Sequence, residues 1–242
     1  MSLNIVALIP ARSGSKGIPH KNIKNYQKNP LIYHSIKIAK ESKYITDIVV
    51  STDSEEYKNI AVKYGAKCPF LRPSNISNDL STDYEFIKHY IQWTQLNDSN
   101  NVPDLIVQLR PTYPNRNIEE LNKCIEIMIN NIDYTSLRTV VKFEKSPFKM
   151  YMIENNTLLP LFNRINNLEE PYNRCRQELP DTYLHNGSID IIRTKSFLKS
   201  NSITGDKIYP YIMNENEIND IDNIQDWDKS EKAFNDSNSD NK

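Results

Sequence analysis

The residues with the clearest chemical purpose form a basic loop near the start of the chain. Residues 10–22 hold Arg12, Lys16 and Lys21, two serine hydroxyls and two of only five glycines. Small residues let backbone N–H groups approach a ligand closely, and several cations neutralise a polyanion, so this combination suits a triphosphate. The Walker pattern and GxGxxG are both absent, and a solvated basic turn is the plainer alternative. The loop follows an apolar run at 5–9, and open α/β sheets bind ligands where strands end. We therefore predict a phosphate site.

The elements that must position this loop alternate along the first 145 residues. Short apolar runs predict strands, and apolar residues at helical spacing predict helices. The strands are expected at 5–9, 47–52, 66–71, 104–109 and 134–143, and the helices at 30–39, 53–64, 82–96 and 118–130. Such alternation predicts an α/β fold with a mostly parallel sheet flanked by helices.

The pattern changes near residue 144, where helical periodicity fades and prolines become frequent. We predict a core over 1–144 and 186–234, an inserted lobe of short strands and loops over 145–185, and a disordered polar tail over 235–242. Regular structure is expected to return at 187–192, 195–200 and 208–213, before a closing helix at 224–233.

The composition limits the class of protein. A chain of 242 residues, 38% hydrophobic and 25% charged, fits one large α/β domain with a smaller lobe. The net charge of −1 gives no reason to expect a nucleic acid partner. No apolar run approaches the roughly 20 residues that cross a bilayer, so no membrane partner is expected. The three cysteines form no CxxC pair and no secretory leader is visible, which predicts a reduced, cytoplasmic protein.

A pair of acidic residues near the C-terminus is the second chemical signal. Asp220 and Asp222 are two positions apart, so in an extended segment their side chains point to the same side. Two carboxylates are typical protein ligands for Mg²⁺, which completes its shell with phosphate oxygens and water. A turn and a helix N-cap are the plainer alternative, and the spacing alone favours it.

Several segments along the chain together resemble one enzyme family. They are ARSGSKG at 11–17 with KN at 21–22, VSTDS at 50–54, LRP at 71–73 followed by Asp79, LRPTYPNR at 109–116, RQELP at 176–180, NGSI at 186–189 and INDID at 218–222. In this order they resemble the sugar-acid cytidylyltransferases, which transfer CMP from CTP to sialic, legionaminic, pseudaminic or 3-deoxy-octulosonic acids. The resemblance implies a Rossmann-like nucleotidyltransferase fold and attack by the sugar's anomeric hydroxyl on the α-phosphate of CTP, releasing pyrophosphate.

The resemblance also implies a role for each matching residue. The residues expected to contact the phosphates are Arg12, Ser15, Lys16 and Lys21, and those expected to contact the base are Ala11, Asn22, Arg72 and Asp83. The expected Mg²⁺ ligands are Asp220 and Asp222. The residues expected to contact the sugar acid are Arg110, Arg176, Gln177 and Asn186. Arg12, Lys16, Lys21 and Asp220 are the residues expected to act in catalysis. The lobe at 145–185 resembles the family's dimerisation segment, so a homodimer is expected.

Five positions depart from the family pattern. Arg110 stands where glutamine is usual, Asp190 replaces a typical tyrosine and Asp83 replaces a serine near the base. Tyr113 and Asn115 replace smaller or apolar residues near Arg110. An ionised Asp83 only accepts hydrogen bonds, so it suits the amino group of cytosine but equally the N1–H and amino group of guanine. The particular sugar acid and a guanylyltransferase variant therefore stay open. A non-catalytic sugar-nucleotide binder is a third possibility, which the full set of cations and carboxylates argues against.

Overall fold

The computed structural model describes residues 3–214 and 220–239, and these divide into two compact units. The first unit comprises 3–139, 187–211 and 220–239, and the second comprises 140–186 and 212–214. The predicted lobe had narrower limits, 145–185. The second unit reaches further because three strands of the central sheet, β6, β11 and β12, continue into it.

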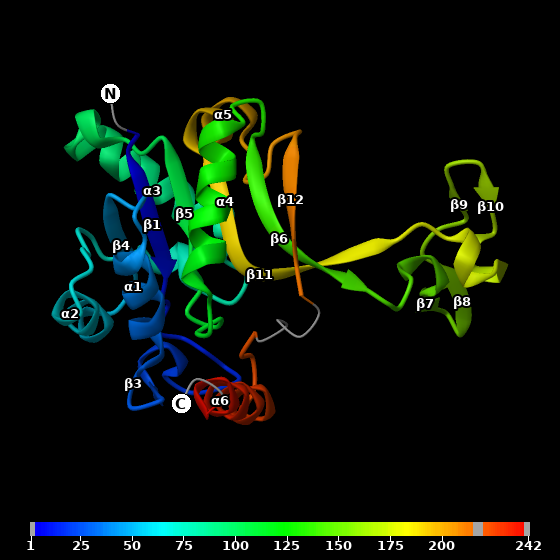
Figure 1. Cartoon of the computed structure of the whole chain (residues 1–242), viewed down its shortest axis with the longest axis horizontal. Helices are drawn as coiled ribbons and strands as arrows, with labels where there is room; N and C mark the ends of the chain where they lie inside the picture. Colours follow the sequence, from blue (N-terminus) through cyan, green and yellow to red (C-terminus); the bar gives the residue numbers. More distant parts are fainter. Residues whose placement is uncertain (1–2, 215–219, 240–242) are drawn as a thin grey trace. The chain divides into compact units, whose positions relative to one another are not determined.

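A six-stranded sheet in the order β12-β6-β11-β5-β1-β4 organises the chain (Figure 1). Its strands are β1 (Ile5–Pro10), β4 (Asp47–Ser51), β5 (Leu105–Gln108), β6 (Ser136–Phe143), β11 (Thr182–Arg193) and β12 (Ile208–Met213). β1 pairs in parallel with both β4 and β5, whereas β11 runs antiparallel to β5. The prediction of a mostly parallel α/β sheet is confirmed.

Helices cover both faces of the sheet in the first unit. They are α1 (Leu31–Glu41), α2 (Glu55–Lys63), α3 (Asp83–Asn97), α4 (Ile118–Asn130) and α5 (Thr194–Ser200). A sixth helix, α6 (Ile224–Ser239), instead contributes Trp227 to a separate buried cluster. One buried cluster joins the sheet to α1, α2 and α4, and a second joins the opposite face to α3 and α5. Because β1 is buried on both sides, its sequence is continuously apolar rather than alternating.

Two elements differ from the sequence-based expectations. The strand predicted at 66–71 is wrong: only Lys67 forms a bridge, to Val49 of β4. Pro69 has no N–H to donate, so a ladder cannot continue past it. At the C-terminus, α6 runs to Ser239, beyond the predicted end at 233, and 240–242 lie outside the described residues.

Small antiparallel pairs make up most of the remaining strands. β2 (Asn25–Tyr26) pairs with β3 (Asn29–Pro30) in the first unit. In the second unit, β7 (Tyr151–Glu154) pairs with β8 (Thr157–Pro160), and β9 (Arg164–Ile165) pairs with β10 (Leu168–Glu169). The short strands and proline-rich turns of this unit explain why its sequence carries no helical periodicity.

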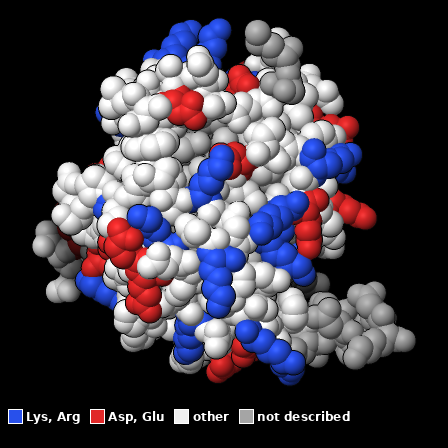
Figure 2. Space-filling model, turned by 90° about the vertical axis from the view of Figure 1, so that its left-hand side faces the viewer, with Lys and Arg blue, Asp and Glu red and all other residues white. Residues whose placement is uncertain are grey.

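The surface shown in Figure 2 carries basic and acidic side chains interspersed over one face, in keeping with the near-zero net charge. Among the residues that the structure describes, no helix has both the length and the apolar character needed to cross a membrane.

Candidate active site

A cavity of about 430 Å³ lies in the first unit, beside the ends of β1 and β5. Four segments line it: the loop after β1, the loop leading into α3 with the first turn of that helix, the loop after β5, and Asp222. Parallel strands bring their carboxyl ends to one edge of a sheet, so loops distant in sequence meet there. The predicted phosphate loop thus forms one wall of a real cavity.

The phosphate loop is held in place by hydrogen bonds at both ends. Ala11 N–H donates to the carbonyl of Ser51 over 2.9 Å. Ser13 donates from its N–H and its hydroxyl to the two carboxylate oxygens of Asp53, both at 2.8 Å. The amide of Asn22 donates to the carbonyl of Arg12 over 2.9 Å. Asn22 is buried, so its donor group serves to shape the loop.

Two of the four residues predicted to contact the phosphates, Arg12 and Lys16, pair with a carboxylate that lines the cavity. Asp79 lies 2.9 Å from Arg12 Nη1 and 2.5 Å from Lys16 Nζ. The two cations, Lys16 first, lower the pKa of Asp79, so it is ionised at neutral pH. Arg12, Lys16, Asp79 and Ser15 all line the cavity. The structure therefore brings these predicted residues together, with Asp79 as their present counter-charge.

The loop also contacts the predicted acidic segment, 200 residues further along the chain. Lys21 Nζ donates to the carbonyl of Ile221 over 2.6 Å and lies 3.3 Å from Asp222 Oδ1. A Cβ on Gly17 would collide with the Asp222 carbonyl oxygen, whereas one on Gly14 would meet nothing within 4 Å. Of the two clustered glycines, close packing therefore requires only Gly17.

Hydrophobic packing holds the acidic segment there. Ile221 is fully buried in a cluster with Ile18, Tyr26, Leu31 and Trp227, the last from α6. Its N–H donates to the carbonyl of Thr112 over 2.9 Å. The alternating pattern Asp-Ile-Asp thus buries its middle residue.

The helix cap of α6 is made by other residues than the acidic pair. Asn223 Oδ1 accepts from the N–H groups of Gln225 and Asp226 at 2.9 and 3.0 Å. Asp226 Oδ2 accepts in return from the N–H groups of Asp222 and Asn223, both over 3.2 Å. The carboxylate of Asp222 therefore takes no part in the helix cap, and its side chain is 74% exposed beside Lys21. The plainer N-cap interpretation of this carboxylate does not apply.

The acidic pair offers hard oxygen ligands but not a complete metal cage. Among the described residues there is no group of three or more acidic, His or Cys side chains that could hold a metal ion. Partial burial of its carboxyl group, followed by the nearby Asp222, raises the pKa of Asp220. An ion bound here would have to take most of its ligands from phosphate and water, which is the usual arrangement for Mg²⁺. The donor set fits that ion.

The lining of the cavity also contains a buried arginine. Arg72 donates from Nε to Ser51 Oγ over 3.1 Å and from Nη2 to the Ser51 carbonyl. Its guanidinium lies 5.2 Å from the centre of the Phe86 ring. Burial lowers the pKa of Arg72 to about 10, with Asp53 and Asp83 acting against that shift. A charged donor is therefore fixed in the cavity wall.

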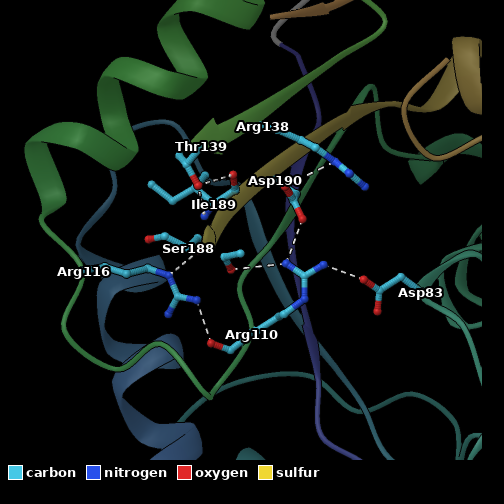
Figure 3. A network of polar contacts seen from close by, with 9 residues as sticks. Asp83, Arg110, Arg116, Arg138, Thr139, Ser188, Ile189 and Asp190 are labelled. Atoms are coloured by element: carbon cyan, nitrogen blue, oxygen red, sulfur yellow. Dashed lines mark hydrogen bonds and ion pairs between the residues drawn. The ribbon is translucent and has the colours of Figure 1, made fainter. Parts of the chain in front are cut away.

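Three of the five positions that depart from the family pattern, Asp83, Arg110 and Asp190, are joined by direct contacts of Arg110 (Figure 3). Arg110 Nη2 donates to Asp83 Oδ2 over 2.5 Å, and its Nη1 donates to Asp190 Oδ2 over 2.7 Å and to the Gly187 carbonyl over 3.2 Å. Asp190 is only 2% exposed and lies 3.9 Å from Arg138 on its other side. Burial alone would lower the pKa of Arg110, but Asp190 and Asp83 outweigh it and raise it. We call Asp83, Arg110 and Asp190 the charged triad.

A second arginine fixes the backbone beneath the charged triad. Arg116 donates from Nε to the Ser188 carbonyl over 2.7 Å and from Nη2 to the Arg110 carbonyl over 2.6 Å. Its Nη1 donates to the Tyr113 carbonyl over 2.5 Å and to Ser35 Oγ over 3.1 Å. Arg116 thereby ties the loop after β5 to β11 and α1.

The remaining predicted sugar-acid residues belong to the second unit. Arg176 and Gln177 lie in a short 3-10 helix, Arg176–Glu178, and are exposed. Arg176 lines a small cavity of about 40 Å³ within that unit. Asn186 is 6% exposed and its amide contacts the sulfur of Met213 over 3.3 Å. Of the predicted sugar-acid residues, only Arg110 lines the cavity of the first unit.

Sequence reasoning assigned no role to three residues that shape the site. Asp53 anchors the phosphate loop, Asp79 neutralises two of its cations and Arg116 clamps the loop after β5. All three residues belong to segments that resemble the family, which was the available signal. Their partners lie 40 and 72 positions away, so local patterns could not reveal the contacts.

Comparisons with known proteins point to one enzyme family. A family model described as cytidylyltransferase matches residues 6–225. A pseudaminic acid cytidylyltransferase of Campylobacter jejuni is 31% identical over 221 residues, covering 91% of this chain and 92% of the relative. A CMP-N,N'-diacetyllegionaminic acid synthase of Legionella pneumophila is 33% identical over 235 residues, covering 96% and 97%. An N-acylneuraminate cytidylyltransferase of Escherichia coli is 28% identical over 228 residues, covering 94% of this chain and 51% of the relative.

Solved structures share the fold. A CMP:2-keto-3-deoxy-manno-octonic acid synthetase in complex with CTP superposes with a TM-score of 0.68 at 14% identity, covering 97% of this chain and 99% of that one. A 4-diphosphocytidyl-2C-methyl-D-erythritol synthase from Anaerococcus prevotii gives 0.62 at 12% identity, covering 97% and 100%. The family resemblance seen in the sequence is confirmed: the chain belongs to the cytidylyltransferases.

Proposed function

We propose that this cytidylyltransferase transfers CMP from CTP to the anomeric hydroxyl of a nonulosonic acid and releases pyrophosphate. The main support is that the cationic loop and Asp222 line one cavity although they are about 200 residues apart in the sequence. The relatives named for pseudaminic and legionaminic acids support this class of acceptor. Pseudaminic, legionaminic and sialic acids all remain candidate substrates.

The proposed reaction exchanges one phosphorus–oxygen bond for another. The anomeric oxygen forms a bond to the α-phosphorus and releases its proton to solvent water, while the bond to the β-phosphate breaks and pyrophosphate leaves. Such a transfer depends on position and charge neutralisation more than on covalent catalysis. Arg12, Lys16 and Lys21 supply fixed positive charge for the triphosphate. Ser15 adds a hydroxyl donor at the same wall.

The other roles follow the family match. Asn22, Arg72, Asp83 and the backbone at Ala11 contact the base, and Arg110, Arg176, Gln177 and Asn186 contact the sugar acid. Asp220 and Asp222 hold Mg²⁺, which neutralises charge on the phosphate oxygens when bound. Because Lys21 lies 3.3 Å from Asp222, it also keeps the acidic segment against the loop.

We also propose that the enzyme works in the cytoplasm, where CTP is made, and as a homodimer. In the second unit, large apolar side chains are exposed on and next to the β7–β8 hairpin: Met152 55%, Ile153 76%, Leu158 61% and Phe162 42%. Such a concentration is costly for a monomer in water. Sedimentation that gives a monomer at micromolar concentration would refute the dimer.

Pyrophosphate release tests the proposed reaction. The assay combines each of the four nucleoside triphosphates with pseudaminic, legionaminic and sialic acids and 3-deoxy-octulosonic acid. We expect release with CTP and a nonulosonic acid. Release with GTP alone would make the chain a guanylyltransferase, and nucleotide binding without release from any pair would make it a non-catalytic binder.

The metal role is tested by Asp222→Asn. An amide is a weaker ligand for a hard cation than a carboxylate, so the Mg²⁺ concentration for half-maximal rate should rise about tenfold or more. Asp226→Asn, at the helix cap, is the control for local unfolding. An unaltered metal titration for Asp222→Asn would return this residue to a structural role.

A further inference from the structure

We propose that Asp83, held in place by Arg110 and Asp190, recognises the exocyclic amino group of cytosine and so sets the preference for CTP over UTP. The proposal rests on the proposed function and names the residues that select the base. It assigns Arg110 and Asp190 as positioning residues for Asp83.

The cavity lining divides by charge into two parts. Arg12, Lys16 and Lys21 suit the triphosphate, and Asp79 and Asp222 pair with these cations. Arg110 is held between Asp83 and Asp190. Arg72 and Asp83 are the remaining charged side chains of the lining. Arg72 is 6% exposed and packs on Phe86, so its orientation is fixed. Asp83 is the first residue of α3 and keeps 36% of its side chain exposed.

In each of these two side chains, one terminal atom makes no hydrogen bond to the described residues. Arg72 uses Nε and Nη2 on Ser51, and its Nη1 has no partner among residues 3–214 and 220–239. Asp83 Oδ2 accepts a hydrogen bond from Arg110, whereas Asp83 Oδ1 has no hydrogen-bond partner among the described residues. The wall therefore presents one fixed donor and one fixed acceptor.

A donor beside an acceptor matches the edge of cytosine. Cytosine offers N3 and O2 as acceptors and its 4-amino group as a donor, so Arg72 and Asp83 can both be satisfied. Uracil carries a carbonyl oxygen in place of the amino group, and that oxygen would face a carboxylate. Two acceptors facing each other in a cavity leave both unpaired, which costs much more than a lost hydrogen bond.

The same geometry argues against guanine. Its N1–H and 2-amino group are two parallel donors that pair best with both oxygens of a carboxylate. Arg110 Nη2 already donates to Asp83 Oδ2 over 2.5 Å, so guanine would have to share that oxygen with the guanidinium. The contact with Arg110 therefore favours cytosine, which needs only one acceptor oxygen from Asp83.

The charged triad explains why Asp83 keeps this orientation. Arg110 is anchored from the opposite side by the buried Asp190 and by the Gly187 carbonyl. Figure 3 shows the guanidinium of Arg110 between the two carboxylates, one contributed by α3 and the other by β11. A guanidinium only donates hydrogen bonds, so whichever acceptor residue 83 carries must turn toward Arg110.

That constraint makes Asp83→Asn an informative variant. Arg110 will hold the amide oxygen, so the amide NH₂ must point into the cavity and become a donor. It then repels the amino group of cytosine and matches the 4-carbonyl of uracil. We expect the ratio of CTP to UTP affinity to fall by about 30- to 100-fold, the usual scale when a hydrogen-bonding site meets the wrong partner.

Binding and turnover are measured separately. Calorimetry with CTP, UTP and GTP in the presence of Mg²⁺, without any sugar acid, gives the affinity ratios, and pyrophosphate release gives kcat/KM for the same nucleotides. Asp98→Asn is the matched control, because it makes the same chemical change at the opposite end of α3. Its ratio should equal that of the unaltered enzyme.

The double variant Arg110→Gln with Asp190→Asn tests the positioning residues. Replacing both avoids leaving Asp190 buried without its partner. Asp83 stays in place but loses its clamp, so the CTP to UTP ratio should fall about tenfold. A ratio is unaffected by any unfolded fraction in the sample, so a merely structural role would leave it unchanged.

The outcomes separate the two levels of the proposal. If the unaltered enzyme binds no nucleotide or releases no pyrophosphate, the proposed function fails. If it prefers CTP and Asp83→Asn keeps the same ratio, base recognition by Asp83 is refuted while the function stands. An unchanged ratio in the double variant removes Arg110 and Asp190 as positioning residues, and a preference for GTP overturns the base assignment altogether.

Discussion

Gly17→Ala tests whether the phosphate loop and the acidic segment must touch for the enzyme to work. A Cβ at Gly17 would overlap the backbone carbonyl oxygen of Asp222. Backbone cannot rotate away as a flexible side chain can, so the two segments must separate by about an ångström to reach ordinary contact. Misplacement on that scale costs on the order of 10²-fold in rate. We therefore expect kcat for pyrophosphate release to fall about 100-fold.

Gly14→Ala is the matched control, three positions earlier in the same loop. A Cβ at Gly14 meets nothing within 4 Å, so its rate should stay within about threefold of the unaltered enzyme, as is usual for surface changes. Urea denaturation of both variants separates loss of fold from loss of geometry. Equal rates for the two variants would refute the reasoning, and so would a Gly17→Ala enzyme as fast as the original.

Three further predictions follow from individual contacts. Arg116→Lys removes the planar guanidinium that donates to three carbonyls and to Ser35 Oγ. Because one or two buried carbonyls then lose their partner, the free energy of unfolding in urea titrations should fall by about 2–4 kcal/mol. A loss below about 0.5 kcal/mol would contradict this role of Arg116. Asp79→Asn removes the negative charge that now pairs with Arg12 and Lys16. Inorganic tripolyphosphate should therefore bind roughly 2- to 10-fold more tightly in calorimetry. Weaker binding would show that Asp79 contributes to binding of the anion. Burial lowers the pKa of His34 below its ordinary 6.5; the unfolded chain then takes up the proton first, so stability should fall as pH drops below about 6.5 toward the folded pKa. His34→Gln should flatten that fall in urea midpoints between pH 7.5 and 5.5, and a parallel decline in both proteins would exclude His34.

Much of the fold could be predicted because the strongest signals are local. The apolar run of β1 and the periodicity of α1 and α4 reflect burial that each element shows on its own. The strand expected at 66–71 failed because its pairing depends on a partner and on Pro69, not on β-propensity.

The candidate site was predictable in part for the same reason. The cations of the phosphate loop are close in sequence, and their spacing carries a chemical meaning. The contacts that complete the site join residues far apart, as in Lys21 with Ile221 or Arg110 with Asp190. Spacing along the chain holds no information about such pairs unless a family pattern supplies it.

The sequence by itself determined the class of fold, the basic loop at the end of the first strand and the family, because these depend on residue types at short, regular spacing. Only the tertiary structure decided that Asp222 stands free of the helix cap and that Gly17, not Gly14, is needed for close packing. It also showed that Arg110 forms ion pairs with both Asp83 and Asp190, two other residues that depart from the family pattern. The physical reason is that charge compensation and steric contact act through space, where folding brings together groups that the chain keeps far apart.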